Sequence, residues 1–251
     1  MNEIVTGIGF PIVVGVVNFV ANKVYTQFTG DERSFFWKKK IHLIDHFDSR
    51  TDLEELKKRL KIVVIDDHDI FPVQPFTDAG YSIERWNTVK DYSKLESGAY
   101  DIIVLDIFDV AQHLSEDDGL GVLDSLKKKN PAQIIIAYSG HSFDLSKQRF
   151  WDLADEKIVK PSSFLRIKDV MDNVVNQRFT LKRYWEVVLD TLEEYNVDEK
   201  AIGKIETLFV NALSTGRELN WGKVAEIVHN QQLIIKLMPV GNLITKNFRK
   251  K

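Results

Sequence analysis

Four short apolar runs, each followed directly by a polar or charged residue, constrain the fold of this chain more than any other feature. The clearest is Ile102–Leu105, four consecutive apolar residues that lead into Asp106. Such a run fits a strand that is buried on both faces of a parallel sheet. The other three runs, 61–65, 133–138 and 157–159, lead into Asp66-Asp67, Ser139-Gly140 and Lys160-Pro161.

The polar residues that follow these runs are expected to lie together. Right-handed crossovers bring the carboxyl ends of parallel strands to one edge of the sheet, where ligands bind. Carboxylates that lie close together repel one another unless a cation lies among them, and oxygen ligands suit Mg²⁺. An aspartate beside Mg²⁺, with a hydroxyl and an ammonium nearby, is equipped to accept a phosphoryl group.

The order and spacing of five motifs resemble the receiver domain of two-component response regulators. The resemblance covers roughly residues 61–175, under half of the 251-residue chain. It implies an α/β fold with a doubly wound, flavodoxin-like sheet of five parallel strands. The motifs are Ile65-Asp66-Asp67-His68, Leu105-Asp106, Asp118-Gly119-Leu120, Tyr138-Ser139-Gly140 and Val159-Lys160-Pro161.

The resemblance implies a phosphoacceptor and a metal site. Asp106 matches the acceptor, and Asp66 and Asp67 match the acid pair that holds Mg²⁺ together with Asp106. The backbone carbonyl of Phe108, two residues beyond the acceptor, would be a further ligand. A purely structural role stays open for each acid, since an aspartate at the end of a strand also caps turns and helices.

Ser139 and Lys160 match two further functional positions of the family. The hydroxyl of Ser139 would bond a phosphoryl oxygen, and the ammonium of Lys160 would pair with the acceptor carboxylate or the phosphoryl group. A turn serine and a solvated lysine are the plain alternatives. The partner implied is a histidine kinase or a phosphotransfer protein.

Three features depart from the family pattern. Lys157 stands where the family has its switch aromatic, three residues before the lysine. Residues 107–117 are longer than usual and acidic, and Pro72 and Pro75 fall where the first helix should run. These departures favour a second hypothesis, a pseudo-receiver that acts as an interaction or scaffold domain.

Residues 1–60 are predicted to form an N-terminal hydrophobic helix and a helical connector into the first strand, and residues 4–22 carry no charge. Nineteen residues are at the lower end of what spans a bilayer, and the basic residues follow this stretch. A membrane helix with its C-terminal side in the cytoplasm and a soluble packing helix both remain open. The first supports a third hypothesis, a membrane effector gated by the receiver, and the protein is expected at the cytoplasmic side of the membrane or in the cytoplasm.

Residues 179–251 are predicted to form a C-terminal helical domain after a receiver-like domain over 61–178. Helical patterns cover 181–195, 198–214 and 221–237, and Pro239 and Gly241 are expected to end the last one. The basic residues after 245 are interpreted as a solvated terminus.

Composition excludes several classes of function. A net charge of −3 argues against a dedicated nucleic-acid binder, and the chain has no cysteine for disulfide or thiolate chemistry. The sequence has no kinase, cyclase or phosphodiesterase motif, so we do not expect an enzyme. Self-association stays open.

Overall fold

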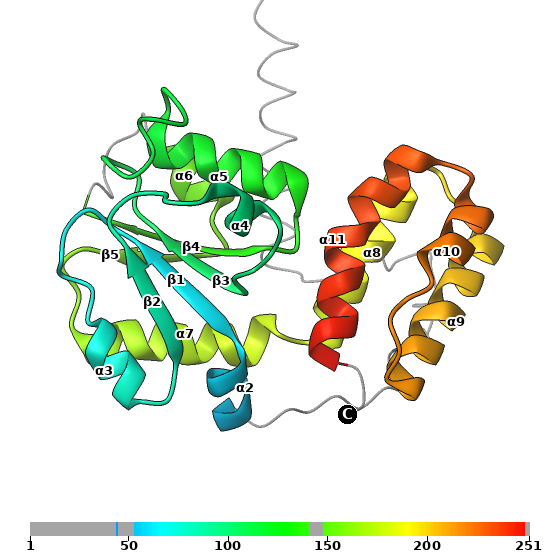
Figure 1. The fold of residues 1–251 in the computed structure, drawn as a ribbon, viewed down its shortest axis with the longest axis horizontal. Helices are drawn as coiled ribbons and strands as arrows, with labels where there is room; N and C mark the ends of the chain where they lie inside the picture. Colours follow the sequence, from blue (N-terminus) through cyan, green and yellow to red (C-terminus); the bar gives the residue numbers. More distant parts are fainter. Residues whose placement is uncertain (1–43, 45–52, 141–147, 249–251) are drawn as a thin grey trace, which may run out of the picture. The chain divides into compact units, whose positions relative to one another are not determined.

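The computed structural model of the chain describes residue 44, residues 53–140 and residues 148–248. In this part, five parallel strands form one sheet in the order β2-β1-β3-β4-β5, as predicted (Figure 1). The strands are β1 (Lys61–Ile65), β2 (Ser82–Trp86), β3 (Ile102–Leu105), β4 (Ile134–Ser139) and β5 (Glu156–Val159).

Helices cover both faces of the sheet, which is why its central strands are apolar throughout. Ile102 and Val104 of β3 belong to one core, while Ile103 and Leu105 belong to a second core on the other face. The first core includes α2, α3 and α7, and the second includes α4, α5 and α6. These helices are α2 (Leu53–Arg59), α3 (Val73–Asp78), α4 (Tyr92–Glu96), α5 (Asp118–Lys129), α6 (Gln148–Leu153) and α7 (Phe164–Arg178).

Local sequence sets where several helices begin. The side chain of Asp91 accepts a hydrogen bond from the backbone of Lys94 and caps α4, and Ser163 caps α7 in the same way. Helix α3 has only six residues, with Pro72 at its N-cap and Pro75 in its first turn. Proline is tolerated only there, so the prolines explain why the first helix after β1 is short.

The C-terminal segment contains four helices in the described residues, and the prediction of one helix over 221–237 is wrong. His229 adopts a left-handed conformation with φ 48°, and its backbone N–H bonds to the carbonyl of Ala225, which ends the third helix. Asn230 then accepts from the backbone of Leu233 and starts the fourth helix. These helices are α8 (Leu181–Glu194), α9 (Glu199–Thr215), α10 (Trp221–Val228) and α11 (Gln231–Phe248).

Helix α11 also continues through Pro239 and Gly241, where the sequence predicted its end. Proline leaves the carbonyl four residues earlier without its helical donor, and here that residue is Ile235, which is 53% exposed. Gly241 marks a close contact, because a Cβ there would lie 2.6 Å from the Trp221 ring. The prediction of a solvated terminus is likewise wrong for the described residues 246–248, since Phe248 is buried.

The described residues from 44 to 248 belong to one compact unit, in which the C-terminal helices contact the amino ends of the strands. Lys246 of α11 pairs with Asp101, directly before β3, at 2.8 Å. Arg183 of α8 donates to the carbonyl of Ala132, before β4, and lies 3.5 Å from Asp155, before β5. The C-terminal helices therefore attach to the edge of the sheet opposite the one that bears Asp106.

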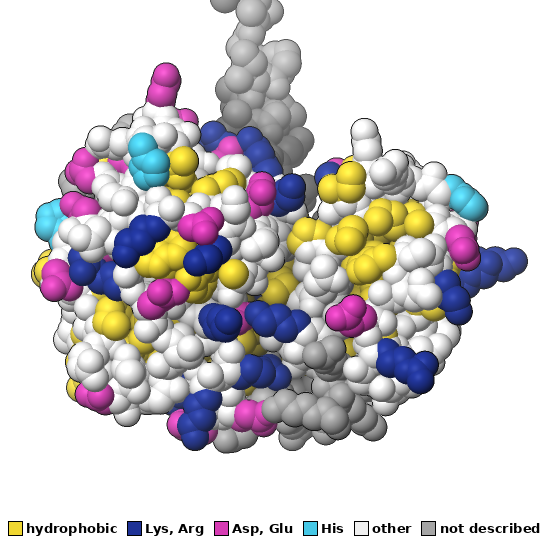
Figure 2. Space-filling view, viewed as in Figure 1, with side chains coloured by type: hydrophobic (Ala, Val, Ile, Leu, Met, Phe, Trp, Pro, Cys, Tyr) yellow, Lys and Arg dark blue, Asp and Glu magenta, His cyan; other side chains and the backbone are white. Residues whose placement is uncertain are grey.

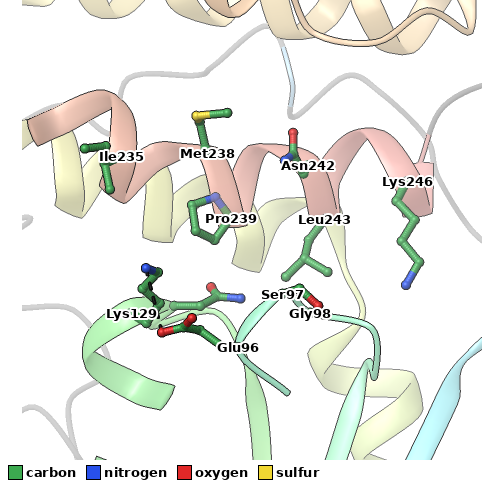
Figure 3. A pocket seen from close by; sticks show the side chains of 11 residues that line it. Glu96, Ser97, Gly98, Lys129, Ile235, Met238, Pro239, Asn242, Leu243 and Lys246 are labelled. Carbon is green, nitrogen blue, oxygen red and sulfur yellow. Dashed lines mark ion pairs between the residues drawn. The ribbon is translucent and has the colours of Figure 1, made fainter. Parts of the chain in front are cut away.

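A cavity of about 400 Å³ lies between α11 and the segment after α4 (Figure 3). It opens beside the exposed apolar side chains of Ile235 and Met238. On the face drawn in Figure 2, acidic and basic side chains are interspersed around apolar patches.

Within the described ranges, no helix is long and apolar enough to cross a membrane. Residues 4–22, for which a membrane helix or a packing helix was predicted, lie outside those ranges. The proposed domain boundaries remain predictions.

Candidate functional site

Hydrogen bonds between strand ends bring the predicted site residues together. The backbone N–H of Asp106 bonds to the carbonyl of Ile65 at 2.9 Å, which places Asp106 beside Asp66. The backbone N–H of Lys160 bonds to the carbonyl of Ser139 at 3.0 Å. The sheet therefore holds the ends of β1, β3, β4 and β5 at one edge, as the apolar runs predicted.

Lys160 joins the two buried carboxylates of this edge. Its ammonium donates to Asp66 Oδ1 and, at 2.5 Å, to Asp106 Oδ2. It also lies 4.6 Å from the centre of the Tyr138 ring. The peptide bond between Lys160 and Pro161 is cis.

Burial dominates the electrostatics of Asp66, whose side chain is fully buried. Burial raises the pKa of Asp66 above its ordinary value, against the opposing hydrogen bond and charge of Lys160. Burial and the charges of Asp66 and Asp106 also raise the pKa of the Tyr138 hydroxyl to about 12. The site therefore combines two buried acids and one ammonium with a neutral phenol beside them.

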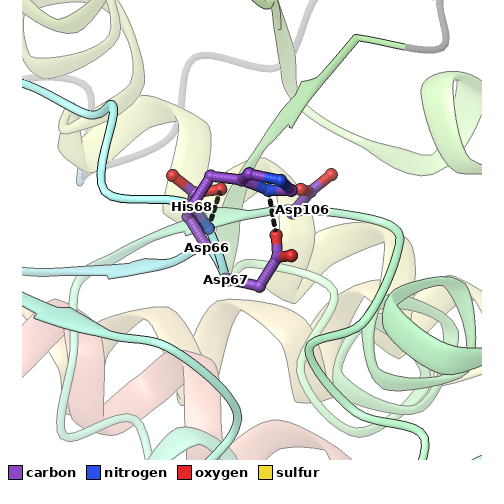
Figure 4. A group of neighbouring side chains, drawn as sticks. All are labelled: Asp66, Asp67, His68 and Asp106. Carbon is purple, nitrogen blue, oxygen red and sulfur yellow. Dashed lines mark hydrogen bonds and ion pairs between the residues drawn. The ribbon is translucent and has the colours of Figure 1, made fainter.

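The residues at this edge fit a divalent cation. Asp66, Asp67, His68 and Asp106 each offer one ligand atom, and these atoms lie within 4.8 Å of one another (Figure 4). Asp66 Oδ2 is buried, and among the described residues it has no hydrogen-bond partner. A buried carboxylate oxygen without a donor is costly, and a bound cation would satisfy it.

A cavity of about 440 Å³ opens over these groups. It gives a small anion or a partner side chain access to Asp106, which is itself almost fully buried. Phe108 lies at this cavity, and the role of its carbonyl as a ligand stays a prediction. The cavity is lined by Asp67, His68, Ile70, Asp106, Phe108, Asp109, Ser139, Gly140 and Lys160.

The long segment 107–117 is anchored by a buried acid. The carboxylate of Asp118 accepts hydrogen bonds from the backbone N–H groups of Asp109, Val110 and Ala111. Val110 and Ala111 are fully buried, so the segment is packed against the domain and is not a fully solvated insertion. The sequence offered Asp118 only as part of a motif and missed this role, which depends on how the segment folds back.

The position three before Lys160 has no aromatic side chain, as the sequence indicated. Lys157 lies on β5 with its ammonium 3.9 Å from Asp152. The aromatic ring that lies under the Lys160 ammonium is instead that of Tyr138, on β4 directly before Ser139. Tyr138 and His68 belong to the motifs at the strand ends, but their sequence positions alone predicted no role for either residue.

Several solved structures resemble part of this chain. A two-component response regulator from Clostridium difficile is 20% identical, covering 48% of this chain and 99% of its own, with a TM-score of 0.40. A receiver domain from Methanospirillum hungatei is 20% identical, covering 47% and 96%, with a TM-score of 0.39. The response regulator TrrA from Thermotoga maritima, solved with Mg²⁺–BeF, is 27% identical, covering 46% and 98%, with a TM-score of 0.38.

No protein-family model and no curated protein matches the chain. The TM-scores are below 0.5, so the fold assignment rests on the strand order and on the residues at the strand ends. The order 2-1-3-4-5 is that of flavodoxin and the chemotaxis receiver CheY. About half of this chain therefore has the CheY-like fold of response-regulator receiver domains, followed by a C-terminal helical extension.

Proposed function

We propose that this chain is a signalling module in which Asp106 accepts a phosphoryl group. The observation that carries the proposal is the placement of Asp106 beside Asp66 and Lys160, under a cavity at the carboxyl edge of the sheet. A cation held by Asp66, Asp67 and Asp106 would offset the negative charge of the acceptor and the incoming group. Mg²⁺ is the cation we propose, with the carbonyl of Phe108 as a further ligand.

In the proposed step, a carboxylate oxygen of Asp106 forms a bond to phosphorus. The bond between phosphorus and the donor atom breaks, and the donor leaves with the electron pair. Lys160 neutralises charge on the acceptor and the transferred group, and the hydroxyl of Ser139 donates to a phosphoryl oxygen. The proposed donor is a phosphohistidine of a histidine kinase or of a phosphotransfer protein.

The conformational change that follows phosphorylation of Asp106 would pass along β3 to the C-terminal helices. Asp106 follows β3 at one end, and Asp101 precedes it at the other. Asp101 pairs with Lys246 of α11, and its side chain is fully buried. A four-residue strand thus separates the acceptor from a contact with the C-terminal helices.

Replacing Asp106 with asparagine tests the proposal. The full chain is incubated with labelled acetyl phosphate and Mg²⁺, and binding of beryllofluoride is followed by fluorine NMR. We expect Mg²⁺-dependent labelling and one bound beryllofluoride in the natural chain, and neither in Asp106→Asn, because the acceptor oxygen is gone. Asp69→Asn, which alters an exposed acid outside the cavity, should behave like the natural chain. Labelling that persists in Asp106→Asn would contradict the assignment.

The scaffold hypothesis remains the alternative, supported by Lys157 at the position of the missing aromatic. It predicts that neither acetyl phosphate nor beryllofluoride modifies the natural chain. It also predicts that Asp106→Ala binds partners normally. The experiment above therefore separates the two functions.

We also propose, from the uncharged stretch 4–22, that the protein associates with a membrane on its cytoplasmic side. Full-length protein should sediment with membranes, and deletion of residues 1–22 should release it. Full-length protein that stays in the supernatant without detergent would contradict this.

A further inference from the structure

His68 belongs to the cluster of acids at the strand ends. Its Nδ1 lies 2.7 Å from Asp67 Oδ1, and its backbone N–H lies 3.4 Å from Asp66 Oδ1. Figure 4 shows the imidazole lying over Asp67 and close to Asp106. The side chain is 68% exposed, so the ring lies at the open side of the site. Among the described residues, no other histidine belongs to such a cluster.

An imidazole changes which cation the site prefers. Mg²⁺ takes oxygen ligands and gains little from a nitrogen donor. Transition cations such as Co²⁺, Ni²⁺ and Zn²⁺ bind imidazole well, and their affinity for nitrogen ligands exceeds that of the alkaline-earth ions. A site with three carboxylates and one imidazole is therefore a mixed oxygen and nitrogen site.

We propose that His68 is a metal ligand that raises the affinity of the site for divalent transition cations, so that these cations bind in competition with Mg²⁺. The proposal rests on the proposed function, because it concerns the cation of the same site. An independent observation supports a cation there, since the buried Asp66 Oδ2 has no hydrogen-bond partner among the described residues. The exposed ring of His68 can exchange its hydrogen bond to Asp67 for the cation at little cost in packing.

The test measures cation binding directly. Isothermal titration of the full chain with Co²⁺ and, separately, with Mg²⁺ compares the natural protein with His68→Gln. Glutamine keeps a hydrogen-bonding group near Asp67 but removes the imidazole. His229→Asn is the matched control, because it removes an imidazole at the end of α10 and asparagine tolerates the left-handed conformation there.

We expect His68→Gln to weaken Co²⁺ binding at least about tenfold, the lower bound for losing even a supporting group of a metal site. Mg²⁺ binding should change less than about twofold in His68→Gln, because Mg²⁺ draws on oxygen ligands. His229→Asn should match the natural chain for both ions. Pulsed electron paramagnetic resonance of the Mn²⁺-loaded protein should show a coupled nitrogen that disappears in His68→Gln.

The other outcomes separate the inference from the proposed function. If His68→Gln weakens the binding of Co²⁺ and of Mg²⁺ equally, His68 only positions Asp67, and the inference is overturned. Unchanged Co²⁺ affinity in His68→Gln, with Asp106 still labelled in the presence of Mg²⁺, would overturn the inference and leave the proposed function intact. A natural chain that binds no divalent cation would defeat both.

Discussion

Replacing Gly119 with alanine should destabilise the folded protein by about 3 kcal/mol or more. A Cβ at this position would lie 2.1 Å from the carbonyl oxygen of Asp106 and 2.9 Å from the Cα of Ile107. Both atoms belong to the backbone, so no side-chain rotation can relieve the contact. The backbone N–H of Gly119 also bonds to the carbonyl of Ile107 at 3.0 Å, which holds the start of α5 in place.

The same substitution should reduce phosphoryl acceptance, because relief of the clash moves the backbone of Asp106. Gly203→Ala is the matched control, since a Cβ there meets nothing within 4 Å inside α9. That variant should be more stable by about 0.5–1 kcal/mol, the usual gain for alanine over glycine in a helix. Urea denaturation, monitored by circular dichroism, measures the free energy of unfolding of both variants. Equal stability of Gly119→Ala and the natural chain would refute the predicted clash.

Replacing Asp155 with alanine should destabilise the protein by about 3–5 kcal/mol, because it leaves a buried ammonium without its counter-charge. The Asp155 carboxylate pairs with Lys127 of α5 and accepts from the backbone N–H of Ile135 at 2.8 Å. The side chains of Lys127 and Asp155 are only 15% and 12% exposed. Arg183 of α8 lies on the other oxygen of Asp155 at 3.5 Å. The substitution therefore also weakens a contact of the C-terminal helices.

The loss in Asp155→Ala should become smaller as the pH rises. Burial lowers the pKa of Lys127 below its ordinary value, and Asp155 opposes that effect in the natural chain. Without Asp155 the pKa of Lys127 falls further, so the folded state binds fewer protons than the unfolded state over a wider range of pH. Stability rises with pH wherever the unfolded state binds more protons. The range runs from the lowered pKa up to the ordinary pKa of lysine near 10.5.

The double variant Lys127→Met/Asp155→Ala separates the charge effect from lost packing. It removes both charges, so it should lose less stability than Asp155→Ala at pH 7. The difference between the two variants should shrink as the pH rises towards the ordinary pKa of lysine near 10.5. Free energies of unfolding from urea titrations at several pH values measure this. A difference that does not depend on pH would mean that Lys127 does not titrate as described.

The sheet and most of the site could be predicted because their signals are local. A strand buried on both faces, such as Ile102–Leu105, is a continuous apolar run, and the residue after it must lie at the carboxyl edge. Strand pairing then brings Asp66 next to Asp106 and Lys160 next to Ser139. The helices α4 and α7 begin at Asp91 and Ser163, residue types that commonly cap helices.

The helix boundaries that were predicted wrongly depend on contacts between distant segments. Gly241 was interpreted as the end of a helix, yet it lies inside α11 because the Trp221 ring packs against its bare Cα. Pro239 is tolerated inside α11 beside the exposed Ile235. A single glycine or proline has the same local preference whether it ends a helix or packs inside one. Only the contacts with the neighbouring helix decide whether the helix continues through that residue.

The sequence by itself determined the order of the strands' apolar runs and the chemical groups at their carboxyl ends. Only the tertiary structure decided that His68 joins the acids, that Asp118 anchors residues 109–111, and that α8 and α11 bind the opposite edge of the sheet. The physical reason is that a strand buried on both faces is recognisable as a run of consecutive apolar residues. Contacts of carboxylates, rings and backbone groups from different segments depend instead on distances that arise only when the chain has folded.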